Sequence, residues 1–136
     1  MILVDLNVIL DVLQAREPHY DHSAELLDRV TARKLEASIS AHATTTIHYL
    51  VQRYQGTGSA NDAVDWLLRY FAVVTIGRDQ LLRARSLKFA DFEDAVIAAA
   101  AESAGCRFIV SRNVKDFKDS PVQAVTPSEF LILTSQ

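Results

Sequence analysis

Aspartate residues stand beside apolar segments in three widely separated parts of this chain. Asp5 directly follows the apolar run Ile2–Val4, and Asp94 lies at the start of an alanine-rich stretch. Asp116 follows a second apolar run, Phe108–Val110. Acids at strand ends and helix starts can meet at one edge of a parallel sheet, and carboxylate oxygens are the ligands that hard cations prefer. The pattern therefore predicts a site for Mg²⁺ or Mn²⁺ formed by Asp5, Asp94 and Asp116.

Amide and carboxylate side chains near these acids could extend the site. Asn113 follows the second apolar run and would supply a neutral oxygen ligand, and Asn7 would line the same pocket. Asp11 lies four residues beyond Asn7, on the same helix face, but an isolated acid there is expected to be solvated. Helix capping is an equally weighted interpretation of Asp5, and turn formation is the simpler one for Asn113 and Asp116.

The segment Asp91–Asp94 contains three acids in four positions, which is more than a helix cap requires. Asp91 and Asp94 are three residues apart and are expected to share a face, whereas Glu93 is expected to point elsewhere. Clustered carboxylates are costly unless a cation offsets their charge. A bound cation could in turn activate water and stabilise an in-line phosphoryl displacement.

Length and composition indicate one domain spanning residues 1–136. Apolar residues make up 49% of the chain, which is ample for one core, and the net charge is −3. That charge gives no general attraction to a polyanion, so any nucleic-acid contact must come from local basic residues and bound metal. A single cysteine, Cys106, excludes an internal disulfide and a cysteine-based zinc cluster, and we expect its thiol to be buried. We expect a cytoplasmic protein, because no segment reads as a signal peptide or a membrane span.

Strand-like and helix-like segments alternate along the chain. This alternation predicts an α/β fold, a three-layer α/β/α sandwich with a mostly parallel central sheet. Residues 55–59 are expected to form the most flexible loop. The predicted strands are residues 2–5, 35–40, 71–75, 107–110 and an edge strand at 122–125; the predicted helices are residues 7–13, 18–32, 41–54, 60–70, 79–86, 91–104 and 127–133.

Three of these segments together resemble the PIN-domain family. They are Met1–Asp11, Phe92–Ala101 and Ile109–Phe117, which follow one another in the family's order over nearly the full length. The resemblance implies a metal-dependent ribonuclease that hydrolyses RNA phosphodiester bonds. Many small bacterial members are VapC-type toxins, so it also implies a cognate antitoxin protein as partner and a homodimer.

For individual residues, the resemblance implies metal-binding and catalytic roles for Asp5, Asp94 and Asp116. Asn113 would stand where the family often has a further acid. Arg112, beside the site in sequence, is the first candidate for RNA binding. Looser candidates for RNA binding are Arg53, Arg78, Arg83, Arg85 and Lys88, each of which is by default a solvated surface charge.

The chain departs from the family at the helix after the second strand, where a glutamate is usual. The stretch Ser40–Tyr49 contains no acid, and Thr45 or Thr46 occupies the approximate place. A hydroxyl can hold a water molecule but cannot act as a carboxylate. Three outcomes stay open: one metal ion instead of two, weak metal binding, or a degenerate domain that binds RNA or a protein without catalysis.

Other functions and sites are less favoured by the residues. A phosphatase of the haloacid dehalogenase type would need a second aspartate where Asn7 stands, and a two-component receiver would carry its phosphoacceptor after a later strand. We expect the histidines to lie at the surface or to pack rather than to catalyse. Four residues, Trp66, Leu67, Tyr70 and Phe71, could form a dimer interface but more simply fill the core.

Overall fold

The computed structural model describes residues 1–135 and contains five parallel strands in the order β3-β2-β1-β4-β5. The predicted α/β fold with a parallel central sheet is confirmed. In chain order the elements are β1 (Ile2–Val4), α1 (Leu6–Leu13), α2 (Tyr20–Thr31), β2 (Ala37–Ser40), α3 (Ala41–Gln55), α4 (Thr57–Tyr70), β3 (Ala72–Val74), α5 (Arg78–Leu87), α6 (Phe92–Ser103), β4 (Phe108–Val110), the 3₁₀ turn η1 (Val114–Phe117), β5 (Ala124–Val125) and α7 (Pro127–Leu133).

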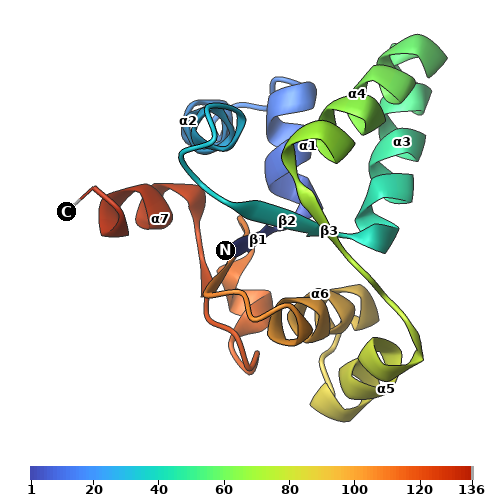
Figure 1. Ribbon diagram of the computed structural model, residues 1–136, viewed down its shortest axis with the longest axis vertical. Helices are drawn as coiled ribbons and strands as arrows, with labels where there is room; N and C mark the ends of the chain where they lie inside the picture. Colours follow the sequence, from blue (N-terminus) through green and yellow to red (C-terminus); the bar gives the residue numbers. More distant parts are fainter. Residues whose placement is uncertain (136) are drawn as a thin grey trace.

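Helices cover both faces of the sheet (Figure 1). Strand side chains alternate between the faces, so Ile2 and Val4 pack into a core shared with α1–α4 and α7, whereas Leu3 packs against α6. Both sides of the central strand β1 are therefore apolar and fully buried. Buried parallel strands of this kind need no polar side chain until the strand ends, which is where Asp5 stands.

Helix α6 packs against one face of the sheet through small side chains. Seven consecutive residues, Ala95–Ala101, are buried, and five of them are alanine. A cap formed by Asp91 begins the helix, and Gly105 follows its end with a φ of 67°. Because alanine allows close approach of the helix backbone, the first turn of α6 comes near the ends of the strands.

Element boundaries differ from the sequence prediction by one to three residues at most elements, and two helix starts show this. Helix α2 begins at Tyr20 rather than at Pro18. Helix α4 begins at Thr57, because Gly56 adopts a φ of 91° and turns the chain in a single residue. The prediction of a flexible loop at residues 55–59 is therefore wrong, because only Gly56 separates α3 from α4.

Several expectations about the core agree with the structure. Leu67 and Phe71 are buried, and Trp66 and Tyr70 pack against the same core, so these four residues support the fold. Cys106 is a buried free thiol. Among residues 1–135, no helix has the length and apolar character needed to cross a membrane.

Candidate functional site

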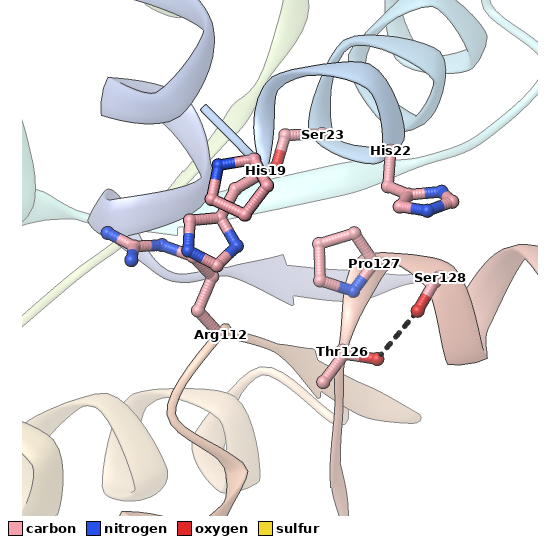
Figure 2. Close-up of a pocket in the computed structure, with 8 residues that line it drawn as sticks. His19, His22, Ser23, Arg112, Thr126, Pro127 and Ser128 are labelled. Carbon is pink, nitrogen blue, oxygen red and sulfur yellow. Dashed lines mark hydrogen bonds between the residues drawn. The ribbon is translucent and has the colours of Figure 1, made fainter. Parts of the chain in front are cut away.

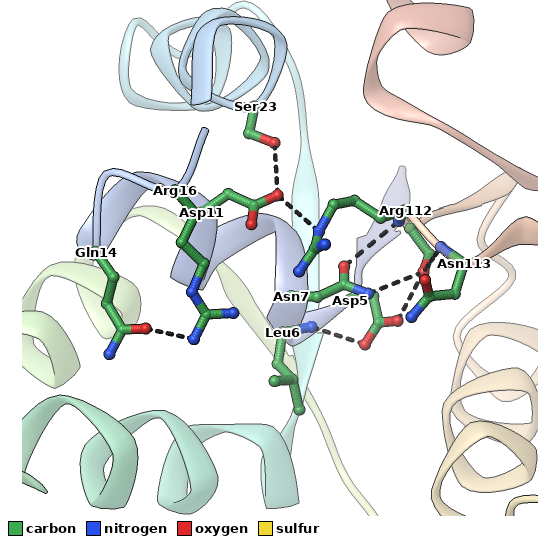
Figure 3. A network of polar contacts seen from close by, with 10 residues as sticks. Asp5, Leu6, Asn7, Asp11, Gln14, Arg16, Ser23, Arg112 and Asn113 are labelled. Carbon is green, nitrogen blue, oxygen red and sulfur yellow. Dashed lines mark hydrogen bonds and ion pairs between the residues drawn. The ribbon is translucent and has the colours of Figure 1, made fainter. Parts of the chain in front are cut away.

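Asp5 is anchored where β1 ends, next to the end of β4. Its Oδ1 accepts a hydrogen bond from the Leu6 backbone N–H (2.8 Å), and its Oδ2 accepts one from the Ser111 hydroxyl (2.8 Å), as Figure 3 shows. The side chain thus caps α1 and is also tied to the adjacent strand. Burial raises the pKa of Asp5, and the hydrogen bonds from Ser111 and Leu6 oppose that rise.

Asp94 lies in the first turn of α6, held there by the cap. Asp91 Oδ1 accepts hydrogen bonds from the backbone N–H groups of Glu93 (2.8 Å) and Asp94 (3.2 Å). Burial, followed by the charges of Asp91, Asp5, Asp116 and Glu93, raises the pKa of Asp94 to about 7. Asp5 and Asp116 therefore lie near enough to Asp94 for their charges to act on it.

Asp5, Asp94 and Asp116 lie near one another but do not form a ready-made metal site. Within residues 1–135, no three histidine, cysteine, aspartate or glutamate side chains lie close enough to form a ready-made metal site. Any cation would therefore require small side-chain adjustments or bridging water oxygens, and Mg²⁺ commonly keeps several of its waters.

Glu93 is exposed in the first turn of α6, close enough for its charge to act on two of the acids. Its charge contributes to the raised pKa values of both Asp5 and Asp94. The expectation that its side chain points away from Asp91 and Asp94 stays a prediction.

Ser111 organises the loop that follows β4. Besides Asp5, it contacts the Asn7 side-chain amide (Nδ2 to Oγ, 3.4 Å), and its hydroxyl accepts a hydrogen bond from the Asn113 backbone N–H (3.1 Å). The Asn7 carbonyl in turn accepts a hydrogen bond from the Arg112 backbone N–H (3.5 Å). Asn7 therefore supports the loop, and the exposed Asn113 lies at its outer side.

The threonines that replace the usual glutamate do not offer free hydroxyls. Thr45 and Thr46 each donate to the His42 backbone carbonyl, at 2.9 Å and 3.5 Å. Sequence reasoning also missed Ser111, whose hydroxyl donates to Asp5. A signal was present, because Ser111 is a hydroxyl residue that directly follows a buried strand.

Asp11 is buried and paired, so its interpretation as a solvated surface acid is wrong. It is 0% exposed, and its Oδ2 lies 2.9 Å from Arg112 Nε and 3.4 Å from the Ser23 hydroxyl (Figure 3). Burial raises the pKa of Asp11, and the Arg112 guanidinium opposes the rise. Because Arg112 is held by Asp11, RNA contact by this arginine stays a prediction.

A pocket of about 190 Å³ opens on the other side of Arg112 (Figure 2). His19, His22 and Ser23 line it together with Arg112 and residues at the start of α7. None of the predicted metal-binding acids lines this pocket. It is therefore separate from the acid cluster, with Arg112 standing between the two.

Comparisons with known proteins agree in family and fold. A family profile described as "PIN domain" matches residues 1–115. Ribonuclease VapC1 of Aquifex aeolicus (strain VF5) is 25% identical over 134 residues, covering 95% of this chain and 92% of that protein. A toxin–antitoxin complex from Klebsiella pneumoniae contains a chain of similar fold, with a TM-score of 0.72, 23% identity and coverage of 93% and 98%. VapC20 of Mycobacterium tuberculosis, described as a sarcin-ricin loop cleaving toxin, has a TM-score of 0.66 and 19% identity, with coverage of 80% and 87%.

Proposed function

Because the chain belongs to the PIN-domain family, we propose that it is a divalent-metal-dependent endoribonuclease and the toxin of a toxin–antitoxin pair. One observation carries the proposal: the charges of Asp5 and Asp116 act on Asp94, although the three acids lie far apart in sequence. The similarity to a ribonuclease and to chains of toxin–antitoxin complexes supports the choice of RNA as substrate and of an antitoxin as partner. A homodimer and a cytoplasmic location are part of the same proposal.

The donor set fits Mg²⁺ or Mn²⁺. Asp5, Asp94 and Asp116 offer carboxylate oxygens, and Asn113 offers a neutral amide oxygen. Burial, followed by the charges of the neighbouring acids, raises the pKa of Asp94 to about 7, and a bound cation would offset those charges. A divalent cation at this position would lower the pKa of a coordinated water and offset charge on the phosphate in the transition state.

The protein groups would each contribute a defined part of the site. Asp5 is the most firmly oriented acid, because Leu6 and Ser111 each hold one of its oxygens. Asp94 stands in the first turn of α6, the helix that covers the face of the sheet opposite to α1. Asp116 is exposed in η1 and would complete the rim nearest to incoming RNA.

A second candidate function is a degenerate PIN domain that binds RNA or a protein without cleavage. The observation that favours it is the lack of an acid on α3, where the hydroxyls of Thr45 and Thr46 are bonded to the His42 carbonyl. This candidate predicts RNA binding that does not depend on Mg²⁺ or Mn²⁺ and no cleaved product.

RNA cleavage with and without divalent metal tests the proposal. We expect cleavage in Mg²⁺ or Mn²⁺ and none in EDTA, with a loss of at least about 100-fold in Asp5→Asn, since an anchored ligand would be gone. Asp65→Asn, an exposed acid on α4, is the matched control and should cleave as the wild type does. Equal cleavage by wild type and Asp5→Asn would contradict the proposed role of Asp5.

A further inference from the structure

The pocket on the far side of Arg112 forms where three parts of the chain meet. His19 and His22 lie at the start of α2, Arg112 in the loop after β4, and Pro127 and Ser128 at the start of α7. In Figure 2 the side chain of His22 lies opposite Pro127 and Ser128. The pocket measures about 190 Å³, whereas pockets for drug-sized ligands measure about 300–1,000 Å³. A ligand that fits it is therefore smaller, about the size of one heterocyclic base.

Rings and hydroxyl groups together form the wall of this pocket. The imidazoles of His19 and His22 line it, as does the pyrrolidine ring of Pro127. Thr126 and Ser128 add two hydroxyls, whose oxygens lie 3.3 Å apart (Figure 2). A hydroxyl can donate one hydrogen bond and accept others, so Ser128 keeps capacity for a ligand after its contact with Thr126. A flat ligand with hydrogen-bonding groups on its edge matches both features.

Little net charge faces this pocket. Of the residues that line it within residues 1–135, Arg112 alone is permanently charged, and its Nε lies 2.9 Å from Oδ2 of Asp11, which is 0% exposed. The Ser23 hydroxyl is also directed to that carboxylate, at 3.4 Å. A phosphate would have to compete with Asp11 for the guanidinium and would meet a negative charge behind it. An uncharged ligand therefore fits the pocket better than an anion.

The loop after β4 joins this pocket to the acid cluster. Arg112 lines the pocket, and the residue before it, Ser111, donates a hydrogen bond to Asp5 (2.8 Å). Neighbouring Cα atoms are about 3.8 Å apart, so the two places are close enough for adjoining parts of one nucleotide strand. Single-stranded RNA is recognised largely through unstacked bases, which stack on ring side chains and form hydrogen bonds through their edges.

We propose that this pocket binds one nucleobase of the RNA, beside the phosphodiester bond that the acids cleave. This inference rests on the proposed function, since it names the part of the same enzyme that reads the RNA sequence. The base stacks on the imidazoles of His19 and His22 and forms hydrogen bonds with Ser128 through its edge. Cleavage then prefers one base at a fixed position beside the cut, because a base without matching groups leaves the hydroxyl unpaired.

Nuclear magnetic resonance of the imidazole ring protons tests the pocket without reference to cleavage. The whole chain in EDTA is titrated separately with each common nucleoside 5′-monophosphate, with ribose 5-phosphate and with inorganic phosphate. We expect at least one nucleotide to shift the signals of His19 and His22, while those of His42 and His48, which do not line the pocket, stay in place. Ribose 5-phosphate and phosphate should shift none of them. Equal shifts with ribose 5-phosphate, or no shift with any nucleotide, would overturn the inference.

Sequencing of the products cut from a random RNA pool in Mn²⁺ tests the consequence for specificity. The wild type should prefer one base beside the cut, and His22→Ala should lower that preference by about 10-fold, as expected for one lost stacking contact. His48→Ala is the matched control: it makes the same change on α3, outside the pocket, and should keep the wild-type preference. Thermal unfolding checks that both variants fold.

The outcomes separate this inference from the proposed function. Cleavage without any base preference, or an equal preference in wild type and His22→Ala, would overturn the base pocket and leave the ribonuclease standing. Absence of cleavage by the wild type would contradict the ribonuclease, and the nucleotide titration would then decide by itself whether the pocket binds a base.

Discussion

Asp94 is the residue at which the competing forces on the site are clearest. Burial and four neighbouring acids all disfavour its charged form, and they raise its pKa from 3.8 to about 7. A carboxylate in this setting destabilises the metal-free fold, because ionisation is easier in the unfolded chain. Such a cost is typical of residues kept for a function rather than for stability.

Replacing Asp94 by asparagine should therefore stabilise the metal-free protein. Between about pH 4 and 7 the folded state binds the proton that the unfolded state has released, so this residue lowers the free energy of unfolding as pH rises. Asp94→Asn removes that slope and should raise the free energy of unfolding at pH 8 by about 1 kcal/mol, after allowance for solvent screening. Urea denaturation in EDTA from pH 4.5 to 8 measures it. An unchanged pH slope in Asp94→Asn, with Asp65→Asn as control, would count against this account.

Single residues were predictable where chain position determined their environment. Asp5 directly follows a strand, and Asp94 lies in the first turn of a helix. Their placement at a sheet edge could therefore be anticipated from the sequence. Asp11 could not be placed in this way. Its burial depends on Arg112, a residue far away in sequence that reaches it only because β4 lies beside β1.

At the scale of elements, the position of α6 determines whether its acids reach the strand ends. Ala98 and Ala100 are 0% exposed and lie against the sheet through small side chains. The alanine-rich composition was visible in the sequence and correctly suggested close packing. How near the charge of Glu93 would then come to Asp5 depended on tertiary geometry that helical periodicity does not contain.

Enlarging a buried alanine of α6 should disturb both stability and the site. Ala98→Leu is expected to cost about 1–3 kcal/mol, because the core has no room for the added atoms. The helix would move away from the sheet, and Mn²⁺ affinity should fall with it. Urea denaturation and Mn²⁺ titration measure the two effects. Ser103→Leu, on the exposed end of the same helix, should leave Mn²⁺ affinity unchanged; a similar loss in both variants would argue against the packing explanation.

The buried ion pair links three other elements. Asp11 on α1 contacts Ser23 on α2 and Arg112 in the loop after β4. Arg112→Gln should destabilise the fold by about 2–4 kcal/mol, because the buried Asp11 carboxylate loses its counter-charge. The double variant Asp11→Asn/Arg112→Gln should recover part of that loss. A double-mutant cycle in urea measures the coupling, and strictly additive effects would show that the pair contributes no specific interaction.

At the scale of the whole molecule, strand order explains where the site lies. The chain runs outward from β1 through β2 to β3 and then returns to place β4 on the opposite side of β1. Ligands in open α/β sheets bind where the strand order reverses in this way, at the carboxyl ends of the strands. Alternation of strands and helices predicted the fold class, but the order of the strands follows from long-range pairing and could not be obtained from local patterns.

Calorimetric titration of the metal-free protein with Mn²⁺ at pH 7.5 tests the central claim most directly, because it asks whether the gathered acids bind a cation. We expect saturable binding in the wild type and a loss of affinity of about 10-fold or more in Asp94→Asn, since the altered group stands among the acids that would bind the ion. Absence of binding in the wild type, or equal affinity in Asp94→Asn, would contradict a metal site at this edge of the sheet.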